Sequence, residues 1–94
     1  MKPTAYLINT ARGGVVEEDA LCEALKGGTI AGAAIDVLDE EPMRDGHPYL
    51  EVPNMIITPH VAWAAVESRT RLINRVADNL SAFIAGNPIN VVNK

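Results

Sequence analysis

An apolar, β-prone run at residues 5–8 is followed by a helical pattern and then by a second apolar run at residues 31–38. The helical segment, residues 17–26, begins with three acidic residues and is preceded and followed by a Gly-Gly pair. Such features start and end helices. A strand–helix–strand unit of this kind is almost always a right-handed crossover between parallel strands. This part of the chain therefore predicts an α/β fold.

A third β-prone run and a long helical pattern complete the expected architecture. The run covers residues 55–58, and the helical pattern extends from residue 62 to about residue 85. Its apolar residues repeat at helical spacing; they are Leu72, Ile73, Val76, Leu80, Phe83 and Ile84. We predict three parallel strands and about two main helices. At ~1.5 Å per residue the second helix would be roughly 35 Å long, so part of it should pack on a surface outside this small sheet.

The composition places the chain among ordinary globular proteins and excludes several classes of partner. It has 94 residues, 48% of them apolar, and a formal net charge of −4 with acidic and basic residues interspersed. Because there is no basic stripe, nucleic acids and anionic membranes are not expected partners. No apolar run approaches the ~20 residues of a membrane span, and the first residues lack the apolar core of a secretory signal. We therefore expect a cytoplasmic protein.

The single cysteine, Cys22, excludes a disulfide framework or a cluster of thiolate metal ligands within the chain. We expect it to be a small buried residue of the first helix. No metal site is predicted.

Residues 39–54 are rich in turn-forming residues and predict a long loop. Loops of this length inside compact domains usually have a function or are mobile. We expect Tyr49 and Leu50 to anchor the loop to the body of the protein, and His47 to be a turn residue rather than a second catalytic base.

Three polar residues, Arg12, Glu41 and His60, each follow one of the β-prone runs. Neighbouring parallel strands lie about 5 Å apart, and open α/β sheets bind ligands outside the carboxyl ends of their strands. If the three runs are neighbouring parallel strands, a guanidinium, a carboxylate and an imidazole face one crevice.

Arg12 is suited to bind a small carboxylic acid, because a guanidinium can hold a carboxylate through two parallel hydrogen bonds. The flexible Gly-Gly turn that follows it would allow Arg12 to face a ligand. The alternative is a salt bridge on the surface.

His60 with a nearby carboxylate would form an acid/base pair, since the carboxylate stabilises the imidazolium. The alternative is a hydrogen-bonded structural histidine. Spacing alone leaves the partner open among Asp36, Asp39, Glu40 and Glu41. Asp36 interrupts an otherwise apolar strand, and it either accepts structural hydrogen bonds near the strand end or contacts a ligand.

Several segments, taken in order along the chain, resemble the D-isomer-specific 2-hydroxyacid dehydrogenase family. They are residues 1–14 (MKPTAYLINTARGG), residues 34–37 (AIDV) with 41–42 (EP), and residues 53–54 (PN) with 58–60 (TPH). The resemblance implies the second half of a Rossmann-like, doubly wound parallel sheet.

The resemblance also implies roles for individual residues. Arg12 would bind the substrate carboxylate and polarise its keto oxygen, His60 would exchange the hydroxyl proton, and Glu41 would hydrogen-bond His60. Asp36 would contact the nicotinamide amide. The residues expected to contact the cofactor, NAD or NADP, are Thr10, Ala11, Arg12, Asp36, Val61 and Ala62.

Members of this family are longer, with an outer substrate lobe and a nucleotide lobe whose first half carries phosphate-binding glycines. No glycine-rich dinucleotide motif occurs in this chain. Residues 1–85 are therefore expected to be the C-terminal half of the NAD(P)-binding domain with the catalytic residues, and residues 86–94 a tail returning toward the missing substrate lobe. Alone, this fragment should be inactive, and the open edge of its first strand predicts a homodimer.

Residues 60–64, 67–69 and 87–93 look most like glycerate dehydrogenases, also called hydroxypyruvate reductases. The resemblance implies a small 2-keto or D-2-hydroxy acid substrate, such as hydroxypyruvate, glyoxylate or glycerate. Two alternatives with the same fold are an NAD-sensing, corepressor-like binding module and a self-standing association module.

Overall fold

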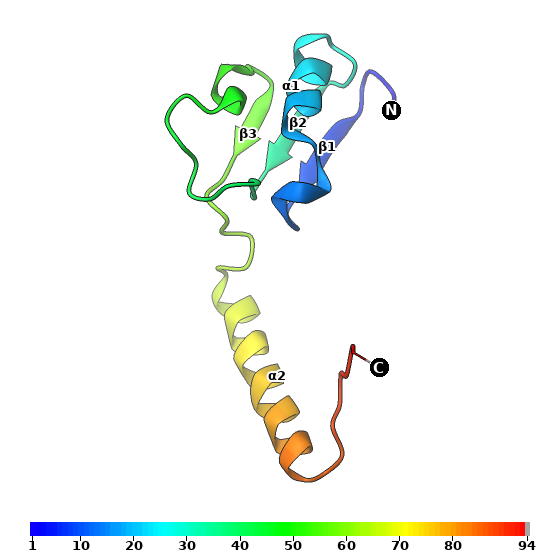
Figure 1. The fold of residues 1–94 in the computed structure, drawn as a ribbon, viewed down its shortest axis with the longest axis vertical. Coiled ribbons are helices and arrows are strands. Elements are labelled where there is room, and N and C mark those ends of the chain that lie inside the picture. Colours follow the sequence, from blue (N-terminus) through cyan, green and yellow to red (C-terminus); the bar gives the residue numbers. More distant parts are fainter. Residues whose placement is uncertain (94) are drawn as a thin grey trace. The chain divides into compact units, whose positions relative to one another are not determined.

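The computed structural model describes residues 1–93, which divide into two compact units (Figure 1). The first unit comprises Met1–Ala62, and the second begins at Trp63. Each unit is described by itself.

The first unit is built on a three-stranded parallel sheet in the order β1-β2-β3. The strands are β1 (Tyr6–Asn9), β2 (Gly32–Ile35) and β3 (Met55–Ile57), and helix α1 (Glu18–Lys26) connects the first two. The predicted fold, with three parallel strands and two main helices, is confirmed.

The central strand is shorter than the apolar run that predicted it, residues 31–38. Thr58, the residue after β3, donates the last hydrogen bond to the central strand, from its N–H to the carbonyl of Ile35 over 3.0 Å. The next groups on this side that could bond to the central strand are the carbonyl of Thr58 and the N–H of His60, and these two bond to each other over 3.0 Å. The strand pairing therefore stops there, and the chain turns at the carboxyl edge of the sheet.

One face of the sheet is covered by α1 and forms the core. Leu21, Cys22 and Leu25 of the helix belong to a buried cluster with Ala33 and Ile35 of β2. Cys22 is buried in this cluster, as predicted. Burial raises the pKa of its thiol, as expected for an inert core residue.

The opposite face of the sheet is apolar and exposed. Tyr6, Ile8 and Ile56 are 70%, 72% and 66% exposed, and the strand register places Ile8, Ala34 and Ile56 side by side. Parallel sheets are normally covered on both faces, so this surface, which we call the open sheet face, lacks its usual cover within the first unit.

The long loop after β2 is attached to the first unit at several points. Tyr49, in the 3-10 helix η2 (Pro48–Glu51), is 2% exposed and confirms its predicted anchoring role. The same prediction for Leu50 is wrong, because Leu50 is 59% exposed and the buried Val52 follows two residues later. His47 is the turn residue that caps η2, and its Nδ1 accepts a hydrogen bond from the N–H of Tyr49 over 3.3 Å.

Glu18, at the start of α1, binds this loop at two places. Its Oε1 accepts a hydrogen bond from the N–H of Asp39 over 3.0 Å, and its Oε2 lies 3.2 Å from Nε2 of His47. One carboxylate thus holds both ends of residues 39–47 against α1.

The second unit consists of helix α2 (Val66–Ile84) and the segment that follows it. The helix begins four residues later than predicted, because Ala65, with φ of −57° and ψ of 140°, does not have a helical conformation. Its apolar stripe, expected to pack on another surface, is exposed; it comprises Leu72, Ile73, Val76, Leu80, Phe83 and Ile84. No helix among residues 1–93 is both long and apolar enough to cross a membrane.

Gly13 and Gly14 provide a matched test of the close packing near the end of β1. A Cβ on Gly13 would lie 2.0 Å from the carbonyl carbon of Leu38, whereas one on Gly14 would lie 3.4 Å from its nearest neighbour, Oδ1 of Asp39. We expect Gly13→Ala to lower the free energy of unfolding by at least ~1–3 kcal/mol and Gly14→Ala to change it by less than ~0.5 kcal/mol. Urea denaturation of the two variants measures this difference, and equal losses would contradict the described packing.

Candidate active site

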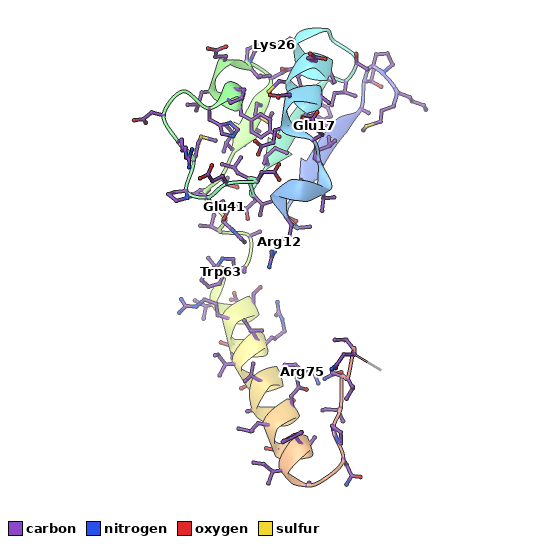
Figure 2. All side chains as sticks on the ribbon, viewed as in Figure 1. Arg12, Glu17, Lys26, Glu41, Trp63 and Arg75 are labelled. Atoms are coloured by element: carbon purple, nitrogen blue, oxygen red, sulfur yellow. The ribbon has the colours of Figure 1, made fainter. Side chains whose placement is uncertain are left out.

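Arg12 lies in a turn that is held by the buried side chain of Asn9, the last residue of β1. Asn9 is 5% exposed. Its Nδ2 donates to the carbonyl of Arg12 over 2.8 Å, and its Oδ1 accepts from the N–H of Ala11 over 3.1 Å. The Arg12 backbone is extended and its side chain is exposed, so the guanidinium projects from the carboxyl end of β1 (Figure 2).

Gly13 brings this turn against the loop that carries Glu41. It is buried, and its α-carbon packs against the backbone of Leu38 and Asp39 too closely for any side chain. Arg12 and Glu41 consequently lie at the same end of the sheet (Figure 2). The positive charge of Arg12 contributes to lowering the pKa of Glu41.

Glu41 is the acid that contacts His60. Its Oε2 lies 2.6 Å from Nδ1 of His60, and its Oε1 accepts a hydrogen bond from the N–H of Leu38 over 3.0 Å. These two hydrogen bonds, that from His60 first, lower the pKa of the Glu41 carboxyl. The carboxylate is therefore held in its ionised form, as needed to stabilise an imidazolium.

Asp36 directly follows β2 and binds the chain around His60. Its Oδ1 accepts hydrogen bonds from the hydroxyl of Thr58 over 2.5 Å and from the N–H of Val61 over 3.0 Å. Its Oδ2 accepts from the N–H of Ala62 over 2.9 Å. These bonds, that from Thr58 first, lower the pKa of Asp36. Of the two interpretations left open by the sequence, the structure shows the carboxylate accepting structural donors, while its contact with a cofactor stays a prediction.

His60 itself has a left-handed backbone conformation, with φ of 54°. This region is uncommon for residues other than glycine and costs on the order of 1 kcal/mol, so it persists where the surroundings hold it. Here the N–H of His60 is bonded to the carbonyl of Thr58 over 3.0 Å, and the two following N–H groups are bonded to Asp36.

A cavity of about 480 Å³ adjoins this group, within the usual size range of small-molecule sites. It combines a charged edge with apolar walls and is lined by Asp36, Leu38, Glu41, Pro42, Met43, Ile57, Thr58, Pro59 and His60. Within residues 1–93, no group of three or more His, Cys, Asp or Glu residues is arranged to hold a metal ion.

The sequence patterns do not predict the supporting roles of Asn9, Gly13 and Thr58. Asn9 and Asp36 are the buried polar residues of the described chain. A polar residue at the end of an apolar strand is a signal that could have identified Asn9, as it did Asp36. The packing of Gly13 depends on a segment far along the chain and has no such signal.

Comparison with known proteins identifies the family. Residues 1–62 match the family model described as "D-isomer specific 2-hydroxyacid dehydrogenase, NAD binding domain". The chain belongs to this family. The match covers the whole first unit, which includes the turns that carry Arg12 and His60 and the residues that line the cavity.

Individual relatives are similar over nearly all of this chain. It is 54% identical over 94 residues to the glycerate dehydrogenase of Methylorubrum extorquens, covering 98% of this chain and 30% of that protein. The chain therefore spans less than a third of that relative's length.

Two solved structures share the fold. An acyclic imino acid reductase in complex with NADPH and D-Arg superimposes with a TM-score of 0.85 at 36% identity, covering 98% of this chain and 29% of that one. The NADPH-dependent glyoxylate/hydroxypyruvate reductase of Sinorhizobium meliloti, in complex with NADP and malonate, gives a TM-score of 0.75 at 41% identity, covering 94% and 28%.

The family description names an NAD-binding domain, and the carboxyl edge of the sheet offers exposed backbone and a carboxylate that suit such a cofactor. Residues 10–12 and 61–62 are exposed turns after β1 and β3, at the edge where open α/β sheets bind nucleotides. Oδ2 of Asp36 accepts one hydrogen bond within the described chain and has capacity for another donor.

The lowered pKa values of Glu41 and Asp36 predict acid sensitivity. Both carboxyls ionise below their ordinary values of 4.5 and 3.8 in the folded state. Their stabilising contribution is present above the unfolded-state pKa and is lost as pH falls through the folded-state pKa. We expect the free energy of unfolding to decrease as pH falls below ~4.5. In Glu41→Gln, the free energy of unfolding should fall by a smaller amount over the same pH range.

Urea denaturation as a function of pH measures the effect. Glu23→Gln, which alters an exposed residue of α1, is the control and should keep the dependence of the unsubstituted chain. An unchanged pH dependence in Glu41→Gln would show that this carboxylate is not ionised preferentially in the folded state.

Proposed function

We propose that this chain is the C-terminal catalytic part of an NAD(P)-dependent D-2-hydroxyacid dehydrogenase. The contact of 2.6 Å between Glu41 and His60, at the carboxyl edge of a parallel sheet, carries the proposal. The family match over the same residues supports it. In this proposal residues 1–85 belong to the nucleotide-binding domain. Residues 86–94, of which Lys94 lies outside the described residues, return toward the substrate lobe.

Arg12 would bind the substrate carboxylate. It projects from the end of β1 with its backbone held by Asn9. Its Nη1 donates to the carbonyl of Ala11 over 2.7 Å, so the other N–H groups of the guanidinium would meet the substrate. Two parallel hydrogen bonds to a carboxylate would orient the neighbouring keto group. The positive charge would also polarise the keto oxygen as negative charge develops on it.

His60 and Glu41 would move the proton. Glu41 accepts from Nδ1, so Nε2 would donate its proton to the keto oxygen during reduction and take it back during oxidation. The ionised carboxylate stabilises the imidazolium before transfer and fixes the ring orientation. NAD(P)H, when bound, supplies the hydride that reaches the keto carbon.

The cofactor would be held at its nicotinamide end by the two exposed turns and by Asp36; these residues are Thr10, Ala11, Arg12, Asp36, Val61 and Ala62. The residue that distinguishes NAD from NADP at the ribose 2′ position follows a glycine-rich motif, and no such motif occurs in these 94 residues, so the proposal covers NAD and NADP alike.

The substrate class is a small 2-keto or D-2-hydroxy acid. The names of the relatives support hydroxypyruvate, glyoxylate and glycerate, and malonate bound to the Sinorhizobium meliloti reductase supports recognition of a small carboxylate. A cytoplasmic location belongs to this proposal, in keeping with the unpaired, buried Cys22.

Activity can be tested by placing this chain in a full-length relative. In the joined enzyme, these residues replace the matching 94-residue segment of the Methylorubrum extorquens glycerate dehydrogenase. We expect it to oxidise NADH or NADPH with hydroxypyruvate, and His60→Asn to lower kcat by about 10²- to 10⁴-fold. His47→Asn, which alters the structural histidine of η2, should lower kcat far less. A folded joined enzyme that binds the cofactor without turnover would contradict the proposal.

Arg12→Lys in the joined enzyme tests the role of the guanidinium. Lysine keeps the charge but cannot form two parallel hydrogen bonds with a carboxylate. We expect KM for the keto acid to rise roughly 10- to 100-fold, with the affinity for the cofactor little changed. Arg44→Lys, in the exposed loop, is the control. Equal KM values for the Arg12 variant and the unsubstituted enzyme would remove this assignment.

Self-association of the isolated chain is a separate prediction. The open sheet face exposes Ile8 and Ile56, and β1 is an edge strand that can pair with another chain. We expect a dimer or larger species in sedimentation velocity, weakened by Ile8→Lys. Leu50→Lys, at an exposed apolar residue of η2, should leave it unchanged. A monomer at all concentrations would refute the prediction.

A further inference from the structure

Asp36 binds the backbone after His60 and a side chain before it. The hydroxyl of Thr58 donates to the carboxylate from one side, and the N–H groups of Val61 and Ala62 donate from the other. Asp36 does not contact the imidazole through any of these bonds. Asp36 therefore bonds to the turn on both sides of His60 in the sequence.

We propose that Asp36 is a positioning residue whose carboxylate clamps the turn around His60 and so keeps the imidazole against Glu41. The importance of this position rests on the proposed function, which gives His60 the proton. The clamp itself is a property of the fold.

Asp36 is well placed to act as a fixed point. It is 5% exposed, and its own N–H donates to the carbonyl of Asn9 over 2.9 Å. Asn9 in turn holds the Arg12 turn. The clamp is thus anchored to the central strand and, through one hydrogen bond, to β1.

The turn needs such a clamp because His60 has a positive φ of 54°. A residue other than glycine leaves this conformation when its surroundings allow it. A change in φ at His60 would swing the peptide groups of Val61 and Ala62 away from Asp36 and displace the imidazole from Glu41. The same bonds therefore hold both the backbone conformation and the ring position.

A carboxylate suits this task better than an amide. Both oxygens of Asp36 accept hydrogen bonds. Asparagine has one accepting oxygen, and its NH₂ group would face a donor. Asp36→Asn should therefore preserve the size of the side chain while breaking the clamp on at least one side.

The pKa of Glu41 reports the position of the imidazole. The hydrogen bond from His60 is the first cause of its lowering, followed by the N–H of Leu38, and the charges of His60 and Arg12 add to it. If the imidazole moves away, this pKa rises. Loss of the negative charge of Asp36 alone would lower it, because a nearby like charge disfavours ionisation. The sign of the change therefore separates positioning from simple electrostatics.

The experiment is carbon- and nitrogen-detected NMR of the full 94-residue chain, following the Glu41 carboxyl carbon against pH and the exchange of the Val61 and Ala62 amide protons. In Asp36→Asn, we expect the Glu41 midpoint to rise toward the ordinary value of 4.5 and the two amides to exchange roughly tenfold faster or more. Asp39→Asn removes a nearby charge without touching the clamp and should leave both amides unchanged.

Substitutions of Thr58 test the clamp with the charge of Asp36 intact. Thr58→Val removes the hydroxyl that bonds to Asp36, so the Glu41 midpoint should rise and the amides should exchange faster, both by less than in Asp36→Asn. Thr58→Ser keeps the hydroxyl and should resemble the unsubstituted chain. If Asp36→Asn fails to fold, this pair decides the outcome.

The proposal is overturned if the Glu41 midpoint in Asp36→Asn falls or stays constant, or if Thr58→Val behaves like Thr58→Ser. A spectrum of the unsubstituted chain without folded dispersion would also overturn it. None of these readouts requires dehydrogenase turnover. An inactive joined enzyme with an intact clamp would refute the proposed function alone, and an active one with no response to these substitutions would refute the clamp alone.

Discussion

Parallel pairing of β1, β2 and β3 is the constraint on which the candidate site depends. Because all three strands run in the same direction, their carboxyl ends meet at one edge, and the turns that follow them are brought together. Arg12, Glu41 and His60 are far apart along the chain, yet each follows one of these strands. An antiparallel neighbour would have carried its turn to the opposite edge.

Buried polar side chains convert this rough placement into a defined geometry. Asn9 fixes the turn that carries Arg12, and Asp36 fixes the turn that carries His60. Both residues lie at or just beyond the end of a strand and are 5% exposed, where an unbonded polar group would be costly. The free-energy cost of burying these two side chains is compensated by their hydrogen bonds to the backbone of the turns. The same hydrogen bonds therefore hold the backbone of the turns and place the side chains of the site.

Much of this arrangement could be predicted from local patterns. The runs of apolar residues predicted the strands and their common direction, and the helical stripe predicted α2. The ends of elements were less predictable, because they depend on the local backbone. The pairing of β2 with β3 stops where the N–H of His60 bonds to the carbonyl of Thr58, and α2 starts late because Ala65 is not helical. Spacing alone did not choose Glu41 among four candidate acids. The family resemblance pointed to it, and the physical reason is the return of the loop, which the bond to Leu38 completes. Leu50 was misplaced for the same reason, since nothing in the loop's composition says which of two adjacent apolar residues faces inward.

The double attachment of Glu18 has a consequence for one wall of the cavity. One side of that cavity is formed by Pro42 and Met43, and the segment containing them is tied to α1 at Asp39 and at His47 by the same carboxylate. Both ends of this wall are therefore attached to α1 through a single side chain. Loss of the Glu18 carboxylate would release the two ends at the same time.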